Sequence, residues 1–120
     1  MSTLTTEELT RKKCSPCEGG VPPVSVAEAK AMLTDLEGWT LAHDGKLISR
    51  RWVAKNFMTA IGFFNKVAEL AEEEGHHPDL HLEGYRNVTI NLTTHAIGGL
   101  SENDFILAAK INQIPIAVKK

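Results

Sequence analysis

Four of the five histidines in the chain lie close together, between positions 76 and 95. His76 and His77 are adjacent, and His81 and His95 follow them. Histidine is the side chain best suited to exchange protons near neutral pH. The group could therefore perform general acid–base catalysis, which needs two proton carriers on opposite sides of a small substrate. His95 comes from a separate segment, so only the fold can bring it to the adjacent pair.

Three consecutive glutamates close the helix that we predict before this histidine pair. Glu72 lies four residues before His76, so the two side chains can meet across the last helical turn. A carboxylate beside a histidine stabilises its charged form and fixes its tautomer. Carboxylates at a helix C-terminus face the negative end of the helix dipole, which costs stability. The run Glu72–Glu74 therefore indicates a purpose beyond folding, although charge runs of this kind are more often simply solvated.

Two other interpretations of the histidines stay open at this point. They could form a solvated turn and a solvated loop without a chemical role. They could also bind a metal, since histidine is a common zinc ligand, but adjacent side chains such as His76 and His77 usually point apart. The chain has no H-E-x-x-H motif, and Cys14-x-x-Cys17 lacks the second pair of a zinc ribbon. We therefore predict no metal site.

Length and charge restrict the class of protein. The chain has 120 residues and a formal net charge of -2. That length is typical of one domain, and the charge argues against a nucleic-acid binder, which usually has a basic surplus. No apolar run approaches the ~18 residues of a membrane span, and the first residues do not resemble a signal peptide. We predict a cytoplasmic protein with no direct nucleic-acid partner and no membrane partner.

The N-terminal residues differ in composition from the rest of the chain. Residues 1–23 are polar and carry both cysteines, so we predict a flexible arm with little regular structure, followed by a single domain over residues 24–120. Ser25 begins a capping box that predicts a helix ending near Gly38. Asp44-Gly45 then predicts a hairpin between strands over 39–43 and 47–53.

A long helix, two more strands and a last helix complete the domain. Asn56 caps a helix that runs through Glu74. Its expected apolar stripe consists of Phe57, Ile61, Phe64, Val67, Ala68 and Ala71. Strands are predicted over 80–82 and 85–93, and Ser101 caps the final helix. The order α-β-β-α-β-β-α predicts an α+β fold, a four-stranded antiparallel sheet with helices packed on one face.

The spacing of polar residues around the histidines matches a known pattern. The pattern is Glu72-x-x-x-His76-His77-Pro78, then Tyr85 after six residues, His95 after nine and Asp104 after eight. It resembles the signature of the pterin-4a-carbinolamine dehydratases. The similarity extends to Leu36-x-Gly38-Trp39, to Thr94-His95 and to the arm segment Lys12-Lys13-Cys14-x-x-Cys17-Glu18-Gly19, and so covers nearly the whole chain.

The resemblance implies an enzyme and a reaction. The family dehydrates 4a-hydroxytetrahydropterin, which aromatic amino acid hydroxylases leave behind, to quinonoid dihydropterin in pterin cofactor recycling. Water leaves from C4a as the N5 proton is lost. The chemistry needs an acid at the departing hydroxyl and a base near N5. The resemblance thus implies no metal and no cofactor, because the pterin itself is the substrate.

The resemblance also implies roles for the residues of the central block. Carried over by position, His76 and His95 are the proton carriers, and His77 binds and orients the pterin. Glu72 orients or polarises His76, and Pro78 fixes the turn that holds the pair.

The remaining positions of the pattern receive supporting roles. Thr94 and the backbone at Ala96 are expected to line the pterin edge. Asp104, the third residue of the last helix, has two equally weighted interpretations, a capping residue or a part of the site. Tyr85 is expected to pack at the start of a strand.

Some relatives of this family are protein-binding modules, which gives the alternative function. They include a dimerisation cofactor of a homeodomain transcription factor, and assembly factors that have lost catalytic histidines. This chain keeps all three histidines, which favours the enzyme. The resemblance further implies a homodimer or homotetramer, and functional coupling to an aromatic amino acid hydroxylase.

Overall fold

The computed structural model describes residues 5–12 and 22–119 of the chain. Its helices are α1 (Thr6–Arg11), α2 (Val26–Leu33), α3 (Phe57–Glu74) and α4 (Glu102–Ile111), with a 3-10 turn η1 (His95–Ile97). Its strands are β1 (Thr40–Leu41), β2 (Ile48–Val53), β3 (Asp79–Glu83) and β4 (Asn87–Leu92). The predicted α+β order is confirmed from α2 onward, with η1 added before α4.

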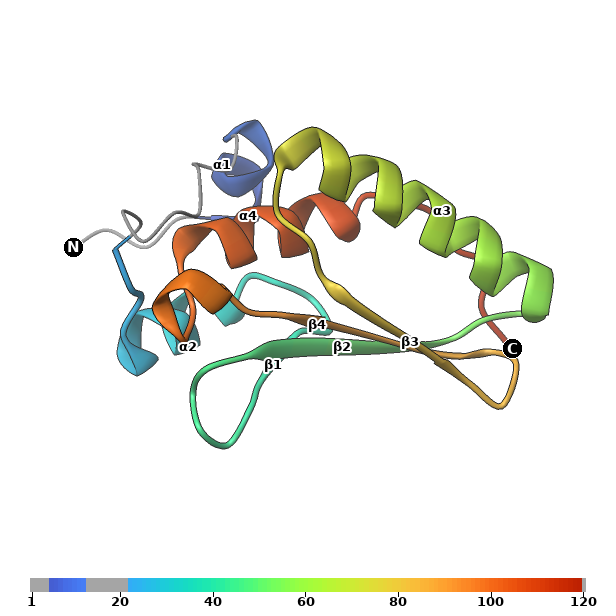
Figure 1. Ribbon diagram of the computed structural model, residues 1–120, viewed down its shortest axis with the longest axis horizontal. Helices are drawn as coiled ribbons and strands as arrows, with labels where there is room; N and C mark the ends of the chain where they lie inside the picture. The colour runs from blue at the N-terminus through green and yellow to red at the C-terminus, as the bar shows by residue number, and fades with distance from the viewer. Residues whose placement is uncertain (1–4, 13–21, 120) are drawn as a thin grey trace.

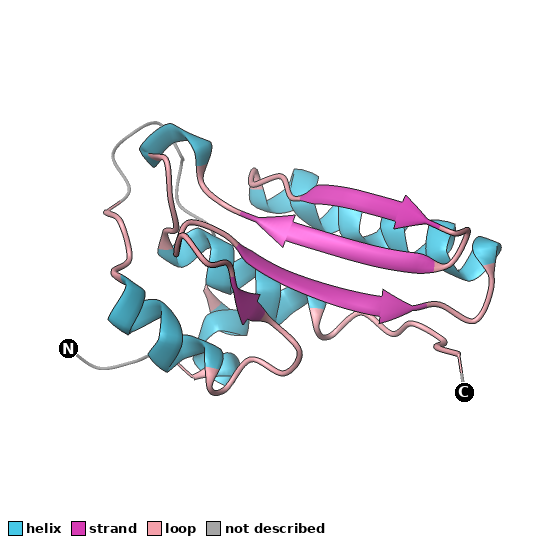
Figure 2. Cartoon of the chain, turned by 90° about the horizontal axis from the view of Figure 1, so that it is seen from below, coloured by secondary structure: helices cyan, strands magenta, loops and turns pink. Residues whose placement is uncertain are grey.

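The four strands form one antiparallel sheet in the order β1-β2-β4-β3. β1–β2 and β3–β4 are hairpins, and α3 crosses over between them. α3 and α4 lie over the same face of the sheet (Figure 1). Seen from below, Figure 2 shows the strands in front and helices behind them. Within the described ranges, no helix is long and apolar enough to cross a membrane.

Side chains alternate across the sheet and place the core beneath the helices. In β4, the buried residues are Val88, Ile90 and Leu92. The alternate residues, Asn87, Thr89 and Asn91, belong to the other face of the sheet. α4 is buried along almost its whole length, because it lies over the sheet and also contacts α1 and α3. A helix held this way is a rigid platform for any side chain that it carries toward a site.

The apolar stripe predicted for α3 is correct in part. Val67 and Ala71 are buried and Phe64 is partly buried against the core, but Phe57 and Ala68 are exposed. The residues that α3 buries are Ala60, Phe63, Val67, Ala71 and Glu74. Phe57 is instead 49% exposed. Both phases of this helix carry apolar residues, so periodicity alone could not choose between them. Phe63 decides the phase because its ring packs against Trp52, with ring centroids 5.1 Å apart.

The N-terminal arm contains regular structure that was not predicted. Thr5 and Glu8 form a capping box at the start of α1, and Leu9 is fully buried. α1 contacts α4, so burial of Leu9 compensates for the shortness of this helix. We predicted little regular structure in this arm, and the structure adds the helix Thr6–Arg11 to it. The cysteines and the rest of that prediction lie outside the described residues.

Two further boundaries differ from the prediction. The first strand is reduced to Thr40–Leu41. The Ala42 N–H still donates to the Leu47 carbonyl at 2.8 Å and closes the turn that follows the strand. Tyr85 does not start a strand. It occupies the β3–β4 turn with φ 55° and is 49% exposed, so its expected packing role is also corrected.

Candidate active site

The C-terminal end of α3 presents the adjacent histidines. Gly75 adopts a left-handed conformation with φ 69°, and its N–H donates to the Ala71 carbonyl at 2.8 Å. Glycine takes this conformation without a steric cost, which ends the helix sharply. The two histidines that follow enter different environments. His76 is 5% exposed, whereas the His77 side chain is 63% exposed.

His76 is paired with a buried carboxylate from another element. Its Nε2 lies 2.6 Å from Oδ1 of Asp104, which is fully buried on the first turn of α4. An ionised carboxylate only accepts hydrogen bonds, so Nε2 carries the proton of this bond. The pairing therefore fixes the tautomer and the orientation of the His76 ring. Asp104 was predicted either to cap the last helix or to be part of the site. Its contacts support both roles, because it bonds the His76 ring and also the backbone N–H of Ser101.

The expected partner of Glu72 is corrected. Glu72 hydrogen-bonds His77 rather than His76, and both side chains are largely exposed. The four-residue rule assumes that the helix continues through position 76, but α3 ends at Glu74 and Gly75 turns the chain. The rotated chain brings His77 to Glu72 and turns His76 inward to Asp104.

The other oxygen of Asp104 is bound as well. Oδ2 accepts from the Thr94 hydroxyl at 2.8 Å and from the Ser101 backbone N–H at 2.9 Å. The Thr94 and Ser101 hydroxyls lie 2.7 Å apart. Asp104 therefore has the predicted capping role, since it bonds Ser101, the N-cap residue of α4. The same carboxylate also joins the segment of His76 to the segment of Thr94.

One pocket brings together five of the predicted site residues, His76, His77, Thr94, His95 and Ala96. It has a volume of about 220 Å³ and is lined by Gly75, His76, His77, Thr93, Thr94, His95 and Ala96. The sheet register explains this meeting, because Asp79 at the start of β3 pairs with Asn91 near the end of β4. Residues just before β3 and just after β4 consequently lie at the same end of these two strands. The pocket is smaller than the roughly 300–1,000 Å³ of sites for drug-sized ligands, which suits a small flat heterocycle.

Some predicted residues lie outside this pocket lining. Glu72 approaches it only through His77, and Pro78 continues the turn into β3. Tyr85 lies at the opposite end of β3, in the turn to β4. His81 is exposed on β3 and contacts Asn91 at 3.3 Å, so it is not part of the group. Thr93 was missed, and its hydroxyl donates to the Lys46 carbonyl at 2.6 Å.

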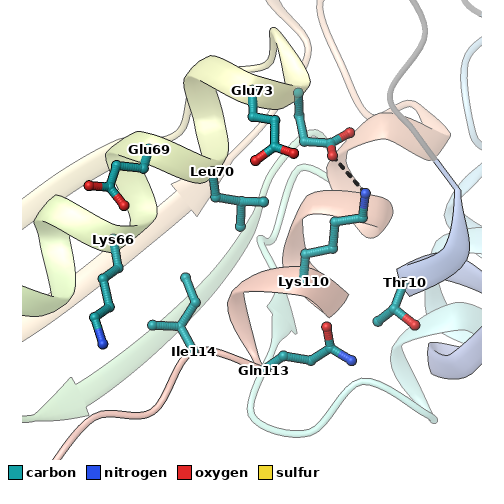
Figure 3. Close-up of a pocket in the computed structure, with 9 residues that line it drawn as sticks. Thr10, Lys66, Glu69, Leu70, Glu73, Lys110, Gln113 and Ile114 are labelled. Carbon is teal, nitrogen blue, oxygen red and sulfur yellow. Dashed lines mark hydrogen bonds and ion pairs between the residues drawn. The ribbon is translucent and has the colours of Figure 1, made fainter.

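A second, larger hollow lies between α3 and α4 and contains no histidine (Figure 3). It measures about 400 Å³ and has both charged and apolar walls. Lys110 of α4 donates to the nearly buried Glu74 at 2.6 Å, the dashed contact in Figure 3. The glutamate run at the end of α3 thus serves two pairings, Glu72 with His77 and Glu74 with Lys110. The second pairing fastens the end of α3 to α4, one residue before the turn that presents His76.

The described side chains contain no group of three or more histidine, cysteine, aspartate or glutamate residues arranged to hold a metal ion. The histidine pocket instead offers three imidazoles, of which those of His76 and His77 are paired with carboxylates. Such a site can donate and accept protons on a small planar ligand. The structure therefore defines a small α+β protein with a histidine-lined pocket where β3 begins and β4 ends.

Comparison with known proteins narrows this description. Residues 22–114 match the model of the family described as pterin 4 alpha carbinolamine dehydratase. The mitochondrial pterin-4-alpha-carbinolamine dehydratase 2 of Arabidopsis thaliana is 48% identical over 91% of this chain, which spans 60% of that longer protein. A relative from Halorhodospira halophila is 47% identical over 88% of this chain and 96% of its own length.

Solved structures agree with the sequence comparison. A protein from Brucella melitensis described as a transcriptional coactivator/pterin dehydratase has a TM-score of 0.71 and 33% identity, over 76% of this chain and 96% of its own. A pterin dehydratase-like RuBisCO assembly factor of the alpha-carboxysome has a TM-score of 0.52 and 23% identity. The match covers 63% of this chain and 87% of that protein, and it shows a shared fold. The chain belongs to the pterin 4 alpha carbinolamine dehydratase family. Its relatives at 48% and 47% identity, both named as dehydratases, class it with the hydro-lyases.

Proposed function

We propose that this protein dehydrates 4a-hydroxytetrahydropterin to quinonoid dihydropterin by histidine acid–base catalysis, within pterin cofactor recycling. The observation that carries the proposal is the single pocket lined by His76, His77 and His95. These side chains come from segments on either side of the β3–β4 hairpin. A flat ligand between them would have proton carriers at more than one edge.

The proposed reaction balances without an oxidant, a metal or a cofactor. An acid protonates the hydroxyl at C4a, the C4a–O bond breaks and water leaves. A base removes the proton from N5, and the electron pair of that N–H bond forms the C4a–N5 double bond. One proton enters and one leaves, so two histidines of opposite protonation state suffice.

The pairings described above support a division of roles. His76 and His95 are the proposed proton carriers, with the His76 ring held by Asp104. His77 is the proposed binding residue, and its exposed pairing with Glu72 orients it at the pocket mouth.

The remaining pocket residues shape the site. Pro78 restricts the turn after the histidine pair. Thr94 and the backbone of Ala96 are proposed to line the pterin edge, because both residues line the pocket. The Thr94 hydroxyl is already bonded to Asp104, so we assign it no direct contact with the pterin.

The test is the rate of dehydration of 4a-hydroxytetrahydropterin generated in situ, after subtraction of the spontaneous rate. Wild type should accelerate the reaction with or without a chelator, and His76→Ala and His95→Ala should each lose about 10²-fold or more. His81→Ala is the matched control, since His81 is exposed on β3 outside the pocket lining. A wild-type rate equal to the spontaneous rate would remove the proposal.

The alternative is a protein-interaction or assembly module on the same fold. The description of the Brucella melitensis relative as a coactivator favours keeping this alternative. Binding of a partner that survives His76→Ala and His95→Ala, in a protein without dehydratase activity, would favour the module.

Oligomerisation, partners and location belong to the same proposal. A homodimer or homotetramer is supported by apolar side chains at the surface, such as Phe57 and Met58, which are 49% and 74% exposed. Light scattering on the purified chain would measure its mass. Coupling to an aromatic amino acid hydroxylase and a cytoplasmic location stay predictions.

A further inference from the structure

The segments that carry the two proposed proton carriers are joined through a pair of buried hydroxyls. Building on the proposed function, we propose that Ser101 and Thr94 are positioning residues of the dehydratase site. Their hydroxyl pair fixes the Asp104 carboxylate against His76 and, at the same time, holds the loop that carries His95.

The direction of the hydrogen bonds follows from the donors available. Asp104 accepts from His76 on Oδ1 and from Thr94 on Oδ2. A hydroxyl has one proton, and that of Thr94 is directed to the carboxylate. The Ser101 hydroxyl must therefore donate to Thr94 Oγ1 across the 2.7 Å contact. The result is a directed chain from Ser101 through Thr94 to Asp104, ending at the His76 ring.

Burial makes this chain difficult to replace. Thr94 is 1% exposed, and Ser101 and Asp104 are fully buried. Water therefore cannot take over a missing hydroxyl without opening the packing around α4. Capping of α4 explains the bond from the Ser101 N–H to Asp104. It does not explain why the Ser101 hydroxyl bonds a residue at the end of β4.

The backbone of Thr94 extends the constraint to His95. The Thr94 N–H donates to the Gly99 carbonyl at 2.8 Å, and the Gly99 N–H returns to the Thr94 carbonyl at 3.4 Å. These bonds close the loop that contains η1, whose first residue is His95. Thr94 is thus fixed by its side chain to Asp104 and by its backbone to the loop. A shift of Thr94 would change the position of His95 relative to His76.

The experiment uses the full chain and variants that differ by one hydroxyl. Thr94→Val and Ser101→Ala should lower kcat about 10- to 100-fold with little change in KM, because supporting hydrogen bonds orient groups that react. Thr94→Ser keeps the hydroxyl and should restore most of the activity. Thr89→Val is the control, since Thr89 lies on β4, the strand that leads to Thr94, and belongs to the sheet face opposite the buried residues of that strand.

A second readout does not depend on activity. The ring ¹⁵N and ¹H resonances of His76 and His95 should both move in Thr94→Val and Ser101→Ala, and neither should move in Thr89→Val. Unchanged ring resonances, or a wild-type kcat in both variants, would overturn the positioning roles. If wild type lacks dehydratase activity while the resonances respond as expected, the proposed function fails and the hydroxyl network stands.

Discussion

Replacement of Asp104 by asparagine tests the assignment of the buried pair most sharply. The amide is nearly isosteric with the carboxylate but has one acceptor and one donor. Its oxygen can still accept from the Thr94 hydroxyl and the Ser101 N–H, which both bond Oδ2. Its NH₂ then faces His76 Nε2, which lies 2.6 Å from Oδ1 in the wild type. Because two donors cannot pair, the ring must move its proton to Nδ1.

The expected magnitudes separate folding from catalysis. One of the three hydrogen bonds to the carboxylate is lost or inverted, and a hydrogen bond to a charged group contributes about 1.5–3 kcal/mol. Small domains have unfolding free energies of about 5–15 kcal/mol, so Asp104→Asn should remain folded. A histidine held in the wrong tautomer loses much more in rate, so we expect kcat to fall about 10²- to 10⁴-fold.

Two assays check this expectation. Urea denaturation measures the free energy of unfolding, and stopped-flow dehydration of 4a-hydroxytetrahydropterin measures kcat. Long-range ¹H–¹⁵N spectra report which nitrogen of His76 carries the proton. A folded Asp104→Asn protein with wild-type kcat and a proton still on Nε2 would refute the pairing as the support of the site.

Three further predictions follow from single contacts. Lys110→Met removes the cation that donates to the nearly buried Glu74. Urea denaturation should show that the free energy of unfolding falls by up to about 3–5 kcal/mol, against about 0.5 kcal/mol or less for Lys66→Met at an exposed position. Equal losses in the two variants would contradict a stabilising role of the Lys110–Glu74 pair. Gly75→Ala meets no atom within 4 Å but keeps φ near 69°, so strain alone should cost about 1–2 kcal/mol, and a neutral variant would refute the strain argument. A backbone hydrogen bond from the N-cap residue, aided by its side chain, lowers the pKa of Glu8. The capping box therefore stabilises α1 above the ordinary carboxyl pKa and is lost as pH falls through the lowered value, so hydrogen exchange in α1, corrected for intrinsic rates, should accelerate in acid but not in Glu8→Gln.

The parts of the fold that the sequence predicted correctly are those with local chemical signals. Asn56 and Gly75 mark the ends of α3, and both act as expected in the structure. The buried face of α3 was predictable only in part, because the choice of that face depends on Phe63 meeting Trp52 from a distant strand. The capping box at Thr5 was present in the sequence, but the buried contact of α1 with α4 that supports it is tertiary.

In the candidate site, too, the sequence predicted what local signals determine and missed what depends on tertiary contacts. The histidine spacing identified which residue types could act, but the partner of each histidine depended on the turn at Gly75. A helical rule paired Glu72 with His76, whereas the left-handed turn gives Glu72 to His77 and Asp104 to His76. Ser101 was predicted only as a cap, because nothing local indicates that its hydroxyl meets the end of β4.

The central claim is that His76 and His95 act together on one pterin. A double-mutant cycle on the dehydration rate tests it most directly, with His76→Ala, His95→Ala and the double variant measured against the spontaneous reaction. If the two histidines act together, each single variant loses about 10²-fold or more, and the double variant loses far less than the product of the two losses, since paired groups act as a unit. Losses that multiply independently, or a single variant that keeps the wild-type rate, would contradict it.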